Sequence, residues 1–76
     1  MPTLFIINGL RFFFYAFDHE PIHVHVEGAD GNAKFLLEPE VTLLENKGLK
    51  AKQIKEAIQV IEVNKDVIKE RWADFH

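Results

Sequence analysis

The sequence predicts an α+β fold, in which a twisted antiparallel sheet of four or five strands packs against one C-terminal amphipathic helix. Two observations predict this fold. Residues 3–45 contain two hairpin signals between runs of β-branched and aromatic residues, whereas apolar residues recur at helical spacing from about residue 50 onward. The chain of 76 residues has no cysteine, so we expect a single domain, 1–76, with a small core and no disulfide.

The first hairpin is predicted between residues 3 and 15, with its turn at Asn8-Gly9. This dipeptide adopts the positive φ angles that a two-residue turn between strands needs. The turn pairs Ile7 with Leu10, Phe5 with Phe12 and Thr3 with Phe14. One face then belongs to the core, and it holds Phe5, Ile7, Leu10, Phe12 and Phe14. The other face is apolar enough that we expect a helix or another protein to cover it, and it holds Leu4, Ile6, Arg11, Phe13 and Tyr15.

The second hairpin is predicted to join residues 23–27 to residues 32–38, after a connection over residues 16–22 in which Pro21 cannot donate to a sheet. Valines alternate with histidines in the first of these strands, which is typical of a half-buried strand. Placing the valines on one face with Ala33 and Phe35 fixes the register. The register pairs Glu27 with Asn32, His25 with Lys34 and His23 with Leu36. Both imidazoles then project to the solvent side, beside Lys34.

The last part of the chain is predicted to form a short strand at residues 41–45, a turn at residues 46–48 and then a helix. Core positions recur three, four or seven residues apart along the helix, and they are Ile54, Ile58, Ile61, Ile68, Trp72 and Phe75. A single helix of about 25 residues is the simplest interpretation, although it is long for a globular protein. A break near Asn64 is the alternative.

The paired histidines are the strongest candidates for chemistry. Histidine titrates near neutral pH, so His23 and His25 could divide the roles of general base and general acid on a phosphodiester. Lys34 or Arg11 would stabilise the charge that develops on the phosphate. A run of lysines with no acidic residue between them could hold an RNA backbone, and it consists of Lys47, Lys50, Lys52 and Lys55. Phe13 or Tyr15 could stack on a base. None of this chemistry requires a cofactor.

A divalent metal site is a second interpretation of the same segment. Three imidazoles, those of His19, His23 and His25, could bind zinc or another divalent ion. Three residues could supply a fourth ligand, namely Asp18, Glu27 and His76.

In a third interpretation, the histidines are polar residues on the outer side of a sheet and have no chemical role. The domain is then a protein-binding module or a homodimer, and its interface consists of Leu4, Ile6, Phe13 and Tyr15. Arg11 is expected to anchor that interface or to lie over an aromatic ring. Whether the chain is an enzyme stays open between these interpretations.

Several segments resemble one family of small bacterial proteins. They are Pro2-Thr3-Leu4-Phe5, Arg11-Phe12-Phe13-Phe14-Tyr15, His19-Glu20-Pro21, His23-Val24-His25-Val26-Glu27-Gly28, Ala33-Lys34-Phe35 and Lys47-Gly48. The family is a domain of unknown function, DUF4160, and the resemblance covers nearly the whole chain. The family pattern usually has two prolines before the first paired histidine, where this chain has Ile22 in the second position.

The resemblance implies a biological setting rather than an activity. Members of this family are commonly encoded beside another short protein, in arrangements similar to toxin–antitoxin pairs. The chain would be the toxin-like member, which binds or cleaves RNA, and its partner would be the neighbouring small protein or a second copy of itself. No membrane-spanning or targeting segment is visible in the sequence, and the lack of cysteine suits the cytoplasm.

Overall fold

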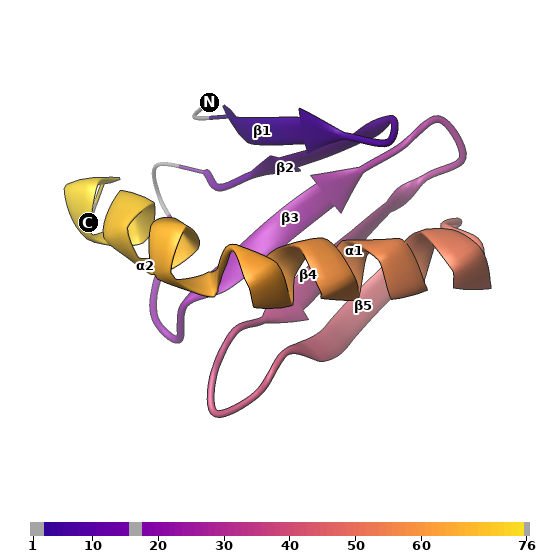
Figure 1. The fold of residues 1–76 in the computed structure, drawn as a ribbon. Coiled ribbons are helices and arrows are strands. Elements are labelled where there is room, and N and C mark those ends of the chain that lie inside the picture. Colours follow the sequence, from indigo (N-terminus) through magenta and orange to yellow (C-terminus); the bar gives the residue numbers. More distant parts are fainter. Residues whose placement is uncertain (1–2, 16–17, 76) are drawn as a thin grey trace.

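The computed structural model describes residues 3–15 and 18–75, and it consists of a five-stranded antiparallel sheet with two helices across one face (Figure 1). The strands are β1 (Thr3–Ile7), β2 (Leu10–Phe13), β3 (His23–Glu27), β4 (Asn32–Leu36) and β5 (Thr42–Lys47). The helices are α1 (Ala51–Val63) and α2 (Lys65–Phe75). Each strand pairs with the next one along the chain, so β1 and β5 form the two edges of the sheet. The predicted α+β fold is confirmed.

The first hairpin has the predicted turn and most of the predicted register. Asn8 has a φ of 54° and Gly9 a φ of 76°, as a two-residue turn requires. Ile7 pairs with Leu10, and Phe5 with Phe12. The predicted pair of Thr3 and Phe14 is wrong, because the register shifts between Thr3 and Phe5 and places Thr3 opposite Phe13. One extra residue in β1 therefore forms a bulge, and the outer part of the strand is displaced by one position.

The predicted register of the second hairpin is confirmed at every pair. His23 lies opposite Leu36, His25 opposite Lys34 and Glu27 opposite Asn32. The valines that alternate with the histidines, Val24 and Val26, are fully buried. On its other side, β3 pairs with β2 so that His25 lies opposite Phe13. His25 therefore occupies the middle of three strands, on the face of the sheet opposite to the buried valines.

The core lies between the sheet and the helices. The sheet contributes Leu10, Phe12, Val24, Val26, Ala33 and Phe35, and the helices contribute Ala57, Ile61, Ile68 and Trp72. Phe14 and Leu37 are buried in the same cluster. The side chain of Phe75 lies outside the described part of the structure. Burial of these apolar side chains is the main favourable term in folding.

The prediction of one continuous helix is wrong, and the alternative break at Asn64 is correct. Asn64 ends α1 with φ −107° and ψ 17°. Its side-chain amide donates to the carbonyl oxygen of Val60 at 2.8 Å, and its backbone N–H donates to the same oxygen at 3.1 Å. Ile61 and Ile68 are nevertheless both buried, because the chain resumes the helix at Lys65. The apolar spacing alone could not reveal this interruption.

The edge strand β5 is longer than predicted and is exposed throughout, including Leu43 and Leu44. Near the end of this strand, the side chain of Asn46 bonds to the backbone N–H and carbonyl of Leu49 and so shapes the turn into α1. Neither helix in the described ranges has the length and apolar character needed to cross a membrane.

Candidate functional site

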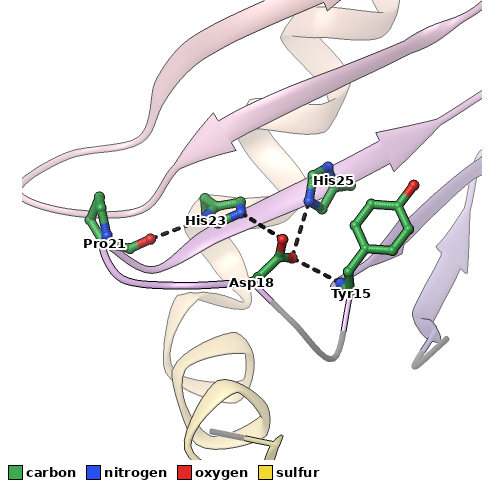
Figure 2. Close-up of polar contacts among 5 residues, drawn as sticks. All are labelled: Tyr15, Asp18, Pro21, His23 and His25. Carbon is green, nitrogen blue, oxygen red and sulfur yellow. Dashed lines mark hydrogen bonds and ion pairs between the residues drawn. The ribbon is translucent and has the colours of Figure 1, made fainter.

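Three side chains converge beside the start of β3, and we call Asp18, His23 and His25 the histidine–aspartate cluster. The Nε2 atom of His23 lies 3.3 Å from Oδ1 of Asp18, and the Nε2 atom of His25 lies 3.1 Å from Oδ2 of the same carboxylate. Figure 2 shows the carboxylate placed between both rings. The two ring centroids are 5.2 Å apart. The two imidazoles therefore share one acidic partner.

The turn between β2 and β3 positions the carboxylate. The backbone N–H of Tyr15 donates to Oδ2 of Asp18 at 2.8 Å, and the N–H of Asp18 donates to the carbonyl oxygen of Tyr15 at 3.1 Å. These two bonds fix the carboxylate independently of the histidines. All three side chains of the cluster remain reachable from solvent, with 14% exposure for Asp18, 13% for His23 and 18% for His25.

Both ring nitrogens of His23 face oxygen atoms. Nδ1 lies 2.9 Å from the carbonyl oxygen of Pro21, and because a carbonyl only accepts, Nδ1 carries a proton and donates it. Nε2 then points at the carboxylate of Asp18. A lone pair facing a carboxylate is unfavourable, so this position favours a bound cation. The ring also rests against Trp72 of α2, with the two ring centroids 5.4 Å apart.

His25 has a different pattern of bonds. Its Nε2–H donates to Asp18, while its Nδ1 has no hydrogen-bond partner among the described residues. The ring stacks on Phe13 at a centroid distance of 5.4 Å and an interplanar angle of 22°, and it meets Tyr15 at 4.7 Å. His25 is therefore held by aromatic contacts on its faces and by Asp18 at one nitrogen, which leaves the other nitrogen available.

The surroundings shift the pKa of two groups in the cluster. Burial lowers the pKa of His25 from its ordinary value, and the charges of His23 and Lys34 lower it further, although Asp18 opposes the shift. Burial alone would raise the pKa of Asp18. The N–H of Tyr15 and the two imidazoles outweigh that effect, so the pKa of Asp18 is lowered on balance.

Acid is therefore expected to destabilise the fold. Because the pKa of His25 is lowered in the folded state, the unfolded chain binds its proton first as the pH falls below the ordinary value of 6.5. The contribution of Asp18 is lost only in stronger acid, as the pH falls through its lowered pKa. We expect a lower thermal midpoint at pH 5 than at pH 7.5 in buffer with EDTA, and a smaller difference for His25→Gln. A midpoint of the wild type that is the same at both pH values would contradict this prediction.

A hollow of about 190 Å³ opens beside the cluster. Its lining includes His25, Tyr15, Lys34, Glu45 and Lys47. Lys34 reaches it from β4 opposite His25, and Lys47 comes from the edge strand, where its Nζ lies 3.0 Å from Oε1 of Glu45. The structure thus brings together three of the residues predicted for phosphate chemistry, and the predicted stacking residue Tyr15 is next to them.

The other predicted phosphate contacts lie elsewhere. Arg11 lies 3.6 Å from Glu27 and places its guanidinium 4.3 Å from the ring centroid of Phe13, which confirms the predicted cation–π contact. Lys50, which precedes α1, lies 3.9 Å from Asp30. The remaining two lysines, Lys52 and Lys55, are exposed on α1. None of these four residues is among the described residues that line the hollow.

The structure also changes the predicted metal ligands. His19 is exposed and is not part of the cluster, whereas Asp18 takes its place beside the two histidines. The sequence offered Asp18 only as one of three possible fourth ligands. Of the other two, Glu27 pairs with Arg11, and His76 lies outside the described residues.

The predicted partner interface is only partly exposed. Ile6 is 67% exposed and Tyr15 45%, while Leu4 is half-buried. Phe13 is 4% exposed and so is not available to a partner. Its cover comes from Arg11, Tyr15 and the ring of His25, which all contact it. Neither a helix nor a second protein is needed to cover this side chain.

Comparison with known proteins gives one match. The model of the family described as "Domain of unknown function (DUF4160)" matches residues 9–73. No curated protein and no solved structure matches the chain significantly.

Proposed function

Because the chain belongs to the DUF4160 family, whose function is unknown, we propose its function from the site: it is the toxin-like member of a two-component module and cleaves RNA. One observation carries the proposal. His25, with an available Nδ1, lines the same hollow as Tyr15, Lys34 and Lys47. A base, a cation and an aromatic ring are groups with which a protein can bind and cleave a single RNA strand, and of the two lysines Lys47 is paired with Glu45.

The chemistry would run through His25. Nδ1 takes the proton of a ribose 2′-hydroxyl, the 2′-oxygen forms a bond to phosphorus, and the bond from phosphorus to the 5′-oxygen breaks. The proton then passes from Nδ1 to the leaving 5′-oxygen. Asp18 accepts the Nε2–H bond of His25 throughout and stabilises the imidazolium that forms. Lys34, the cross-strand neighbour of His25, supplies a cation for the charge on the phosphate.

His23 has a positioning role in this proposal. Both of its nitrogens are engaged, with Pro21 and Asp18, so it is less suited to the role of general acid than the sequence suggested. Tyr15 offers an exposed ring on which a base can stack. The lysines at the start of α1 are left out of this proposal, because they do not line the hollow.

The partner of the module is a small cognate protein encoded nearby or a second copy of the chain. The support is Ile6, a large apolar side chain that is 67% exposed on the edge strand β1. Edge strands present unpaired backbone groups to other chains. A non-catalytic protein-binding module that uses this edge is the second candidate function.

The test compares His25→Gln with His19→Gln, which changes an exposed histidine of the same segment outside the cluster. Induced wild-type protein is expected to arrest growth, and the purified protein to cut single-stranded RNA into products with 2′,3′-cyclic phosphate ends but to leave DNA intact. His25→Gln should reduce cleavage by about 10²-fold to 10⁴-fold. His19→Gln should act like the wild type.

The same assay separates the two candidates. Co-expression of the neighbouring short protein should relieve growth arrest. A wild-type protein that neither arrests growth nor cuts RNA would remove the catalytic proposal, and capture of the neighbouring protein without cleavage would favour the binding module.

A further inference from the structure

We propose that Asp18, His23 and His25 bind one divalent transition-metal ion of the zinc class, and that this ion switches off the acid–base chemistry at His25. The binding part of the inference stands on the geometry of the cluster. The regulatory part rests on the proposed RNA cleavage.

The spacing of the ligand atoms fits an ion. One nitrogen from each histidine and one carboxylate oxygen all lie within 4.8 Å of one another. Zinc binds imidazole nitrogen and carboxylate oxygen in a tetrahedron with bonds of about 2.0–2.2 Å, which places two ligand atoms about 3.4 Å apart. The Nε2 atom of His23 lies 3.3 Å from Oδ1 of Asp18 and the Nε2 atom of His25 lies 3.1 Å from Oδ2, so each nitrogen is already at about this distance from one oxygen of the carboxylate. An ion could therefore enter with small movements of the side chains.

The groups behind the ligands are those of a metal site. A histidine ligand usually donates its second ring N–H to a carbonyl or carboxylate, and His23 donates Nδ1–H to Pro21. A carboxylate ligand is usually held by a hydrogen bond of its own, and the N–H of Tyr15 holds Asp18 at 2.8 Å. Figure 2 shows these supports on the sides of the cluster that face away from its centre.

The charge pattern at the centre also calls for a cation. With Nδ1 of His23 protonated by its bond to Pro21, the lone pair of Nε2 points toward the carboxylate of Asp18. A metal ion between these two groups would bind both.

The chemistry of the ligands selects the class of ion. Two imidazoles and one carboxylate favour zinc, cobalt, nickel or copper, whereas magnesium and calcium prefer sites made of oxygen atoms. Three protein ligands leave at least one position open for water or a substrate. The partial exposure of the three side chains provides access for the ion.

Metal binding and the proposed acid–base role use the same atoms. An ion at Nε2 of His25 takes the lone pair of that nitrogen, so the proton of the neutral ring must sit on Nδ1. Nδ1 is then a donor and cannot accept the proton of a ribose hydroxyl. The zinc-loaded protein is therefore expected to lose the RNA cleavage that the metal-free protein performs.

The experiment uses the full chain without an affinity tag, stripped of metal, and titrates it with zinc chloride in a calorimeter. We expect one ion per chain, with affinity reduced more than about 100-fold by Asp18→Asn and by His23→Gln. His19→Gln is the matched control and should bind like the wild type. As a measurement that needs no variant, ¹⁵N spectra of the wild-type chain should show zinc-dependent shifts in the rings of His23 and His25 and not in that of His19, and the shifts should include Nδ1 of His25, which gains the ring proton.

Each outcome decides one part of the inference. No binding, shifts at His19, or equal affinity in Asp18→Asn would overturn the metal site. Zinc binding by a protein that cuts no RNA would leave the site intact and remove the proposed function. Cleavage that requires added zinc would overturn the regulatory role and assign the ion to catalysis, and cleavage in EDTA that stops with one equivalent of zinc supports both parts.

Discussion

Gly31→Ala is expected to lower the free energy of unfolding by more than about 3 kcal/mol, because there is no room for a methyl group at this position. A Cβ atom at Gly31 would overlap the carbonyl oxygen of Lys47 and would lie 2.8 Å from the Cα atom of Gly48. Both are backbone atoms, which cannot turn away as a side chain could. The loop from β3 to β4 would have to separate from the chain that leaves β5.

The loss extends beyond the overlap itself. The carbonyl oxygen of Gly31 accepts a bond of 2.9 Å from Gly28, and the next residue, Asn32, forms a bridge with Gly48. Movement of the loop would strain both contacts. For a domain of this size, about 3 kcal/mol corresponds to a fall of roughly 12–24 °C in the thermal midpoint, which circular dichroism would record.

A second glycine provides the control. Gly9 has a φ of +76° but no atom within 4 Å of a Cβ position, and asparagine tolerates that backbone conformation better than most residues. Gly9→Asn should therefore lower the free energy of unfolding by less than about 1 kcal/mol. If the thermal midpoint of Gly31→Ala were as high as that of Gly9→Asn, the close approach of the two chain segments would be contradicted.

The strand pairing of the sheet could be predicted from the sequence wherever a turn or an alternating pattern fixes the register. Asn8-Gly9 favours one kind of turn, and a turn of two residues fixes the pairs next to it. The alternation of His23 to Val26 decides the second hairpin, since a slip of one residue would bury both imidazoles and expose both valines. The bulge in β1 has no such signal, so the pair predicted for Thr3 is wrong.

The helix break and the cover of Phe13 depend on side-chain contacts that periodicity does not encode. Asn64 interrupts the helix through its bond to Val60, yet asparagine also occurs inside helices. Phe13 is hidden because a cation and two rings lie against it. Strand alternation places Phe13 on the outer face but does not predict which side chains bury it.

The sequence predicted the two histidines of the site but did not single out its carboxylate, Asp18. A strand places His23 and His25 on one face, and the sequence indicates the strand. The choice between Asp18 and His19 depends on the turn after β2, in which backbone bonds to Tyr15 aim the aspartate at the rings. A signal of this kind is an acidic residue in the turn after a strand, three positions beyond a backbone N–H whose hydrogen bond its side chain can accept.

Trp72→Ala is expected to lower the free energy of unfolding by about 3–5 kcal/mol and to weaken zinc binding as well. Trp72 is 4% exposed, and its ring meets Phe14 at a centroid distance of 5.2 Å and His23 at 5.4 Å. It thus brings α2 into contact with the histidine–aspartate cluster. Removal of the indole leaves a cavity in the core and removes an aromatic contact of the His23 ring.

Two further variants separate packing from the effect on the site. Val67→Ala changes an exposed residue of the same helix and should alter stability by less than about 0.5 kcal/mol. Trp72→Phe keeps an aromatic ring and should keep the fold, so its zinc affinity can be measured by calorimetry on folded protein. We expect that affinity to fall by about tenfold, since an outer contact that orients a ligand typically contributes that much. Unchanged affinity in Trp72→Phe, together with a large loss of stability in Trp72→Ala, would mean that α2 stabilises the core without orienting His23.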